Sequence, residues 1–155
     1  MYIGHGEDVA YAGSFAAGEI IEWYDSNPIN EIEGATFTKR AGTNWIQKIS
    51  LPAGTYWIQS YLLIPFIVSG EAHILIRFYV NDGVTETQER PPLFFSNNAD
   101  SINDKQLEPP VISSGIFTIA STHDIYYKVS TTVATTSSAG NRQSKSNFMM
   151  IRRLA

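Results

Sequence analysis

The chain has 155 residues, no cysteine and a formal net charge of −4. This length fits one domain that can bury a core without disulfides or a structural metal, and the missing cysteine excludes thiol nucleophiles and thiolate metal sites. No basic segment followed by an apolar run opens the chain, so we expect no secretory signal. The longest apolar run is far shorter than the ~20 residues of a membrane helix, so we expect no membrane partner.

The charges are unevenly distributed along the sequence. Residues 1–38 hold seven acidic residues and no Lys or Arg, whereas residues 126–155 hold five basic residues and no acid. Two interpretations stay open: the two ends lie together and neutralise each other, or the acidic end meets a basic partner. We expect no nucleic-acid partner, because a nucleic-acid-binding domain normally carries a larger basic surplus.

Taken in chain order, the sequence predicts a short arm followed by many strands. Residues 1–20 are rich in Gly and Ala and predict an extended N-terminal arm, and residues 21–155 form one domain. Alternating or apolar runs bounded by turn residues predict strands; they span residues 20–24, 35–40, 45–51, 55–66, 73–80, 84–89, 114–120, 125–133 and 147–154. Asn81-Asp82-Gly83 predicts a hairpin turn.

Two segments predict loops, and no segment predicts a helix. Residues 91–112 contain Pro pairs at both ends and many Asn, Asp and Ser residues, which indicates a long irregular loop. Residues 135–146 are polar and indicate an exposed loop. No window of a dozen residues keeps a 3.6-residue apolar period. The predicted fold class is therefore all-β, an antiparallel β-sandwich of jelly-roll topology with an extended N-terminal arm.

The strand predicted over 55–66 is apolar on both faces. Tyr56 and Ile58 fall on one side and Trp57 and Tyr61 on the other, because side chains alternate along a strand. A surface strand of an antiparallel sheet normally has one polar face. One apolar face can fill a sandwich core, so we expect a second subunit to cover the other.

The order of these elements resembles the jelly-roll heads of the complement and tumour-necrosis-factor superfamily. The resemblance rests on Gly54-Thr55-Tyr56 at the start of the long strand, on the strand and turn over 74–83, on the strand pair over 115–129, and on the closing apolar strand over 146–151. It implies a homotrimer whose inner sheet packs along the threefold axis. The oligomer-interface residues it implies are Tyr56, Trp57, Tyr61, Leu63 and Phe148.

The overall composition is also similar to that of small virion proteins of tailed bacteriophages. That resemblance implies a non-enzymatic structural protein made in the host cytoplasm and located in the virion, as a capsid decoration or cement protein or a head-fibre component. Its partner would be the major capsid protein or another virion protein. The arm residues expected to make the attachment are Tyr2, Ile3, Val9, Tyr11 and Phe15. The alternative is a receptor- or glycan-binding head of a phage fibre or another trimeric binding module, with Trp23 and Trp45 as ligand-facing aromatics.

The sequence predicts no catalytic residue, no metal ligand and no cofactor. Ser121, Thr122, His123 and Asp124 include the residue types of a hydrolase, but neighbours in a turn rarely converge on one substrate. The Asn- and Asp-rich residues 97–104 match no calcium-loop spacing, and the histidines lack metal-ligand spacing. We therefore expect a protein that is not an enzyme.

Overall fold

The structure is a computed structural model. It describes residues 1–4, 9–10, 17–62, 66–68, 72–88, 93–97, 105–107, 111–133, 142–143 and 147–155. Every regular element in these residues is a strand. The strands are β1 (Tyr2–Gly4), β2 (Val9–Ala10), β3 (Ile20–Ile21), β4 (Trp23–Tyr24), β5 (Thr36–Lys39), β6 (Trp45–Leu51), β7 (Gly54–Leu62), β8 (Phe66–Val68), β9 (Ala72–Asn81), β10 (Glu86–Gln88), β11 (Leu93–Asn97), β12 (Lys105–Leu107), β13 (Val111–Ile119), β14 (His123–Val133), β15 (Arg142–Gln143) and β16 (Phe148–Arg153).

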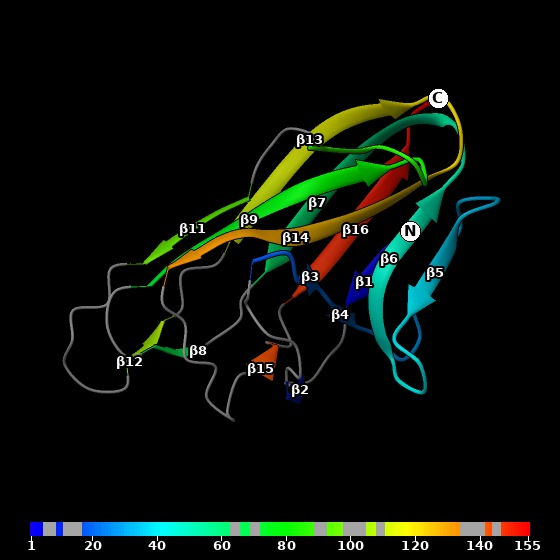
Figure 1. The fold of residues 1–155 in the computed structure, drawn as a ribbon. Helices are drawn as coiled ribbons and strands as arrows, with labels where there is room; N and C mark the ends of the chain where they lie inside the picture. The colour runs from blue at the N-terminus through cyan, green and yellow to red at the C-terminus, as the bar shows by residue number, and fades with distance from the viewer. Residues whose placement is uncertain are drawn as a thin grey trace.

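Two antiparallel sheets make the body of the fold. The four-stranded sheet has the order β1-β16-β7-β13. The eight-stranded sheet has the order β10-β9-β14-β6-β4, with β11 also paired to β9, β3 to β14 and β5 to β6. Figure 1 shows the long strands β7, β9, β13, β14 and β16 aligned along one slanted axis, with paired strands antiparallel. Strands distant in sequence are neighbours in both sheets, and the architecture is a jelly-roll β-sandwich, as predicted.

One hydrophobic core fills the space between the two sheets. Along β7, Tyr56, Ile58 and Leu62 are buried at 0–2% exposure, whereas Trp57 and Tyr61 on the other face are only half-buried. Phe78 and Tyr127 of the eight-stranded sheet face the buried side chains of β7, and the ring centroids of Phe78 and Tyr127 lie 5.3 Å apart. The alternation read from the sequence therefore separates the two faces of β7 correctly, and the structure shows that the face with Tyr56 points inward. Burying such side chains stabilises the fold by about 1.5–3 kcal/mol each.

A cluster of three hydroxyl groups crosses this apolar core, and we call it the buried hydroxyl cluster. Ser60 of β7 and Ser113 of β13 face each other in register on the inner face of the four-stranded sheet. Tyr127 of β14 reaches them from the other sheet: its hydroxyl lies 2.9 Å from Ser60 Oγ and also bonds the Ser113 side chain. Because all three residues are buried, this polar contact ties the two sheets together at one register.

The structure differs from the predicted elements mainly in the segments expected to be irregular. Residues 93–97 form β11, which pairs with β9 from Leu93↔Ile76 to Asn97↔Ala72, and residues 105–107 form β12 against β8. The expected exposed loop contains β15, paired with β2. Backbone pairing outweighs local polarity here, since a strand needs only a complementary edge.

The first residues of the expected arm belong to the sheet. Strand β1 pairs with β16 in the register Tyr2↔Met150, and Tyr2 also exchanges backbone hydrogen bonds of 2.8 and 3.0 Å with Ile29. Asp25 accepts a 2.8 Å hydrogen bond from the Gly4 amide. Residues 1–4 therefore form an edge strand rather than a free arm.

Candidate interaction surface

Four of the seven exposed large hydrophobic residues among those the structure describes lie on the outer face of the four-stranded sheet. Register places Ile112 beside Tyr61, Ile116 beside Trp57, and Met150 beside Tyr2 on this face. The exposed fractions are 64% for Ile112, 62% for Ile116 and 38% for both Met150 and Tyr2. We call this surface the apolar face; its members are Tyr2, Trp57, Tyr61, Ile112, Ile116, Phe148 and Met150.

Aromatic rings form an ordered row across the apolar face. Tyr61 stacks on Phe148 with ring centroids 6.0 Å apart and an interplanar angle of 6°, and Phe148 stacks on Tyr2 at 6.3 Å and 14°. Side-chain hydrogen bonds join β7 to β13 beside this row: Trp57 Nε1 donates to Ser114 Oγ at 3.1 Å, and the hydroxyls of Thr55 and Thr118 lie 3.0 Å apart. The surface is therefore pre-ordered, which lowers the entropy cost of covering it.

The apolar face carries almost no charge. At the described outward positions of β1, β7, β13 and β16, the only ionisable side chain with a full charge at neutral pH is Arg152, which neighbours Trp57 in register. Neutral polar side chains, Gln59 and Ser114, lie among its apolar members. Exposed apolar residues gathered on one face in this way mark interaction sites in proteins. A partner of similar apolar character fits it, since a charged partner would lose hydration without gaining an opposite charge.

The predicted oligomer-interface residues do not share one location. Trp57, Tyr61 and Phe148 lie on the apolar face, where another subunit could reach them. Tyr56 is a correction: its side chain is 0% exposed and its hydroxyl donates to the Pro52 carbonyl at 2.8 Å, so it packs inside its own subunit. Leu63 lies outside the described residues.

The predicted attachment residues are also divided. Tyr2 belongs to the apolar face, but Ile3 is 0% exposed and fills the core of the sandwich, so its side chain cannot contact a separate virion protein. Val9 lies in β2, whose backbone pairs with β15. Tyr11 and Phe15 lie outside the described residues.

The two aromatics predicted to face a ligand are core residues. Trp23 is 3% exposed and packs on Tyr127 at a centroid distance of 5.9 Å, and Trp45 is 7% exposed and meets Tyr24 edge-on at 5.2 Å. The prediction is wrong for both, because the two tryptophans fill the sandwich instead of standing on its surface. A glycan platform built on these side chains would need the core to open.

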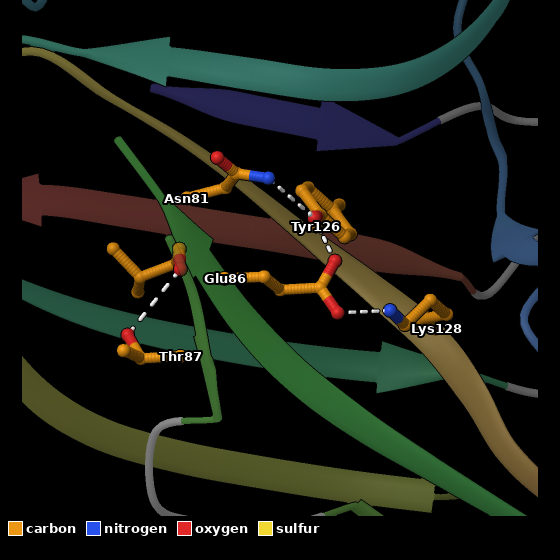
Figure 2. Close-up of polar contacts among 6 residues, drawn as sticks. Asn81, Glu86, Thr87, Tyr126 and Lys128 are labelled. Carbon is orange, nitrogen blue, oxygen red and sulfur yellow. Dashed lines mark hydrogen bonds and ion pairs between the residues drawn. The ribbon is translucent and has the colours of Figure 1, made fainter. Parts of the chain in front are cut away.

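A polar cluster covers part of the outer face of the eight-stranded sheet. Figure 2 shows Glu86 of β10 extending to Tyr126 and Lys128 of β14, which both donate to its carboxylate. Asn81 Nδ2 donates to the Tyr126 hydroxyl at 3.2 Å. Tyr79 stacks on Tyr126 with centroids 6.1 Å apart, and Lys128 lies 4.3 Å from the Tyr79 ring centroid. The cluster fastens the short strand β10 across β9 to β14.

Protonation equilibria in this cluster follow from its contacts. Burial would raise the pKa of Glu86, but hydrogen bonds from Lys128 and Tyr126 and the lysine charges outweigh burial and hold this pKa below its ordinary value. Burial, together with the bond to Glu86, raises the pKa of Tyr126 to about 12. Glu86 is thus an anion and Tyr126 a neutral donor at neutral pH.

The residues with hydrolase-like chemistry do not form a catalytic arrangement. His123 Nδ1 donates to the Ser121 carbonyl at 2.8 Å, a local turn contact, and Asp124 lies 3.8 Å from Lys48. Across the described ranges, no three His, Cys, Asp or Glu side chains gather where they could hold a metal ion. The part of the chain that the structure describes also contains no helix long and apolar enough to cross a membrane.

In the contacts described, the acidic residues of segment 1–38 and the basic residues of segment 126–155 do not pair with each other. Glu22 pairs with Arg40 at 2.5 Å and accepts a 2.8 Å hydrogen bond from Gln47. At the opposite end, Arg153 donates to the Ala53 carbonyl at 2.6 Å. The described ion pair of the acidic segment is therefore internal to the eight-stranded sheet.

Fold and surface together define a jelly-roll β-sandwich with one apolar outer face. The fold is similar to the structure of Eiger TNF from S. frugiperda, with a TM-score of 0.51 and 14% sequence identity over 99% of this chain and 93% of that chain. No protein family and no curated protein matches the sequence. At this level of identity the likeness establishes the fold alone.

Sequence reasoning missed three members of the apolar face: Ile112, Ile116 and Met150. The signal was present, since Ile112 and Ile116 are spaced by four in β13 and so share a face with each other. Phe117 and Ile119, further along the strand and on its opposite face, are buried. The strand is thus apolar on both faces, as β7 is, and the same reasoning applies to it.

Proposed function

We propose that the chain is a non-enzymatic structural subunit that assembles with copies of itself, as a homotrimer, through the apolar face. The observation that carries this proposal is the exposure of Ile112 and Ile116 beside a stacked aromatic row with no acidic residue. Apolar, aromatic-rich surface is what the fully buried centre of an interface contains. A homotrimer is the assembly that the resemblance to tumour-necrosis-factor-like heads implies.

The place of the assembly is a finer proposal. We propose that the subunit belongs to the virion of a tailed phage, as a capsid decoration or head-fibre protein, and this rests on the composition of the chain. A gene neighbourhood free of head and tail proteins would contradict it. The rival role, a receptor- or glycan-binding head, is less favoured, because both tryptophans that would have carried it are in the core.

The assembly is tested by the mass of the protein in solution, measured by light scattering. We expect the mass of three 17.2 kDa chains or a whole multiple of three. In the Met150→Lys variant the new charge would lie in the contact, which costs several kcal/mol if it stays buried. Each 1.4 kcal/mol weakens association tenfold, so threefold species should disappear.

Val84 offers a matched control, because it is 93% exposed and lies at the tip of the β9–β10 turn, away from the apolar face. Val84→Lys introduces the same charge at an exposed apolar position and should leave the mass unchanged. Unaltered threefold assembly of Met150→Lys, with an unchanged melting temperature, would refute the apolar face as the contact.

A further inference from the structure

Arg152 is the one fully charged side chain among the described outward positions of the four-stranded sheet. It is exposed and lies beside Trp57 in register. If another copy covers the apolar face, this guanidinium loses hydration, and it gains nothing in exchange unless an anion faces it. The contact therefore requires an acidic group opposite Arg152.

A threefold contact sets two different surfaces against each other. Contacts in a ring are heterologous, so the residues that face Arg152 belong to a second patch on the neighbouring copy. Placing Arg152 on the axis itself would bring three like charges together, which weakens a contact. The acidic group must therefore come from a surface beside the apolar face, because the described positions of that face contain no acid.

Such a surface borders the apolar face beyond β1. Ile29 and Tyr2 exchange backbone hydrogen bonds of 2.8 and 3.0 Å, and the side chains of a directly opposed antiparallel pair share one face. Ile29 is 54% exposed, so it extends the apolar face past its edge strand. Glu31 and Glu33 follow it and are both exposed. We call Ile29, Glu31 and Glu33 the acidic rim.

The acidic rim lies near β16, but its carboxylates do not pair with Arg152 of the same chain. The Met1 amine donates to the Ile151 carbonyl at 2.9 Å. Burial lowers the pKa of this amine and the charge of Glu31 opposes the shift, which places Glu31 near the amine. The ion pairs within the described residues all lie on or beside the eight-stranded sheet instead. The rim carboxylates can therefore meet a guanidinium of another copy.

The other described carboxylates are less suited to this role. They are held by contacts inside the chain or precede β3 on the other sheet: Glu19, Glu22, Asp25, Asp82, Glu86 and Asp124. Among the described acids, Glu31 and Glu33 alone border the four-stranded sheet and join an exposed apolar side chain. The acidic rim thus matches the apolar face in both hydrophobicity and charge.

We propose that the acidic rim of one copy packs against the apolar face of the next, with Glu31 and Glu33 beside Arg152 of that copy. This inference rests on the proposed homotrimer and names the two surfaces that meet in it. Ile29 then covers apolar side chains of the neighbour, while the guanidinium gains a carboxylate. The uneven charge distribution acquires a role, because the acidic segment 1–38 of one copy meets the basic segment 126–155 of the next.

Charge reversal tests this contact, with the mass from light scattering as the readout. Arg152→Glu and Glu31→Lys/Glu33→Lys should each weaken threefold association at least about tenfold, because like charges then face each other. Arg153→Glu is the matched control. It makes the same change in net charge one residue away, at a side chain that donates to the Ala53 carbonyl of its own chain, and it should leave threefold association unchanged.

Mixing the two reversed variants shows whether the charges meet between chains. The face of each variant then finds a rim of opposite charge on the other, so the mass should rise above that of either variant alone. One contact in a mixed ring of three always joins two copies of the same variant, so the recovery should be partial. A single chain that carries all three substitutions should recover threefold association fully.

The outcomes separate this inference from the proposed function. Wild-type protein that is monomeric removes the assembly and overturns both. Threefold assembly that Arg152→Glu weakens no more than Arg153→Glu leaves the homotrimer standing and overturns the rim contact. A mixture that shows no recovery also overturns the rim contact, because the charges then act within one chain.

Discussion

Replacing Tyr127 with phenylalanine tests the buried hydroxyl cluster that joins the two sheets. The change removes one hydroxyl and leaves the ring, so core packing against Phe78 stays intact. At pH 8 the variant should be less stable by about 1–3 kcal/mol, because Ser60 loses a 2.9 Å hydrogen bond at a position with 0% exposure. The lower end applies if the Ser60 and Ser113 hydroxyls turn toward each other.

The same hydroxyl should make stability depend on alkaline pH. Burial raises the pKa of Tyr127 to about 12, against an ordinary value of 10.0, and the serine hydrogen bonds oppose this only partly. Above pH 10 the unfolded chain loses this proton while the folded chain keeps it. The stabilisation that the neutral Tyr127 hydroxyl contributes to the fold is therefore complete below pH 10 and is lost as the pH rises toward 12. One pKa unit corresponds to ~1.4 kcal/mol, so the total loss is about 3 kcal/mol.

Urea unfolding at a fixed protein concentration, followed by tryptophan fluorescence from pH 8 to 11.5, measures both effects. The free energy of unfolding should be larger for wild type than for Tyr127→Phe at pH 8, and the two values should converge as the pH rises. All other side chains are common to the two proteins, so their contributions cancel in the difference. Ser60→Ala added to the variant should cost less than it does in wild type. A difference that stays constant over this pH range would refute the reasoning.

Two further changes test single contacts. Glu86→Gln should lower the free energy of unfolding by about 1 kcal/mol at pH 7, since it weakens the partly exposed contact with Lys128. The pKa of Glu86 is held low, so this deficit should vanish as acid titration passes through that lowered value. A deficit that stays constant throughout the acid titration would contradict the assignment. Asp25→Ala should lower the free energy of unfolding by about 2 kcal/mol, because the Gly4 amide loses its acceptor. Amide hydrogen exchange at Gly4 should accelerate. Unchanged exchange would mean that pairing with β16 suffices to hold β1.

Local chemistry determined what the sequence could predict. Strand β6 has the predicted bounds, and the predicted turn forms with Asn81 Oδ1 accepting the Gly83 amide at 2.7 Å, while Gly83 takes a φ of 93°. Period-two alternation separates Tyr56 from Trp57 onto opposite faces of β7, as the structure has them. Each of these features depends on neighbours in sequence, which is the information a single sequence carries most directly.

Long-range pairing determined what the sequence could not predict. Nothing near Tyr2 indicates that residues 2–4 add to β16, because the partner lies at the other end of the chain. For this reason the sequence predicts Ile3 as an attachment residue, whereas the structure buries it in the core. The tryptophans are ambiguous for a related reason: Trp23 and Trp45 are the first residues of β4 and β6, and the side that faces inward there is fixed only when Tyr127 and the rest of the core are in place.

The position of β16 between β1 and β7 has a consequence for how the chain reaches its folded state. Met1 donates a 2.9 Å hydrogen bond to the Ile151 carbonyl across 150 positions of sequence. The four-stranded sheet therefore cannot close until residues 148–153 have been synthesised, and such non-local topology folds slowly. Until then β7 pairs with β13 on one side only. Its other edge is open to strands of neighbouring nascent chains, and its side chains Trp57 and Tyr61 are exposed to them. The strand order thus makes the interval before β16 arrives the period in which misassembly competes with folding.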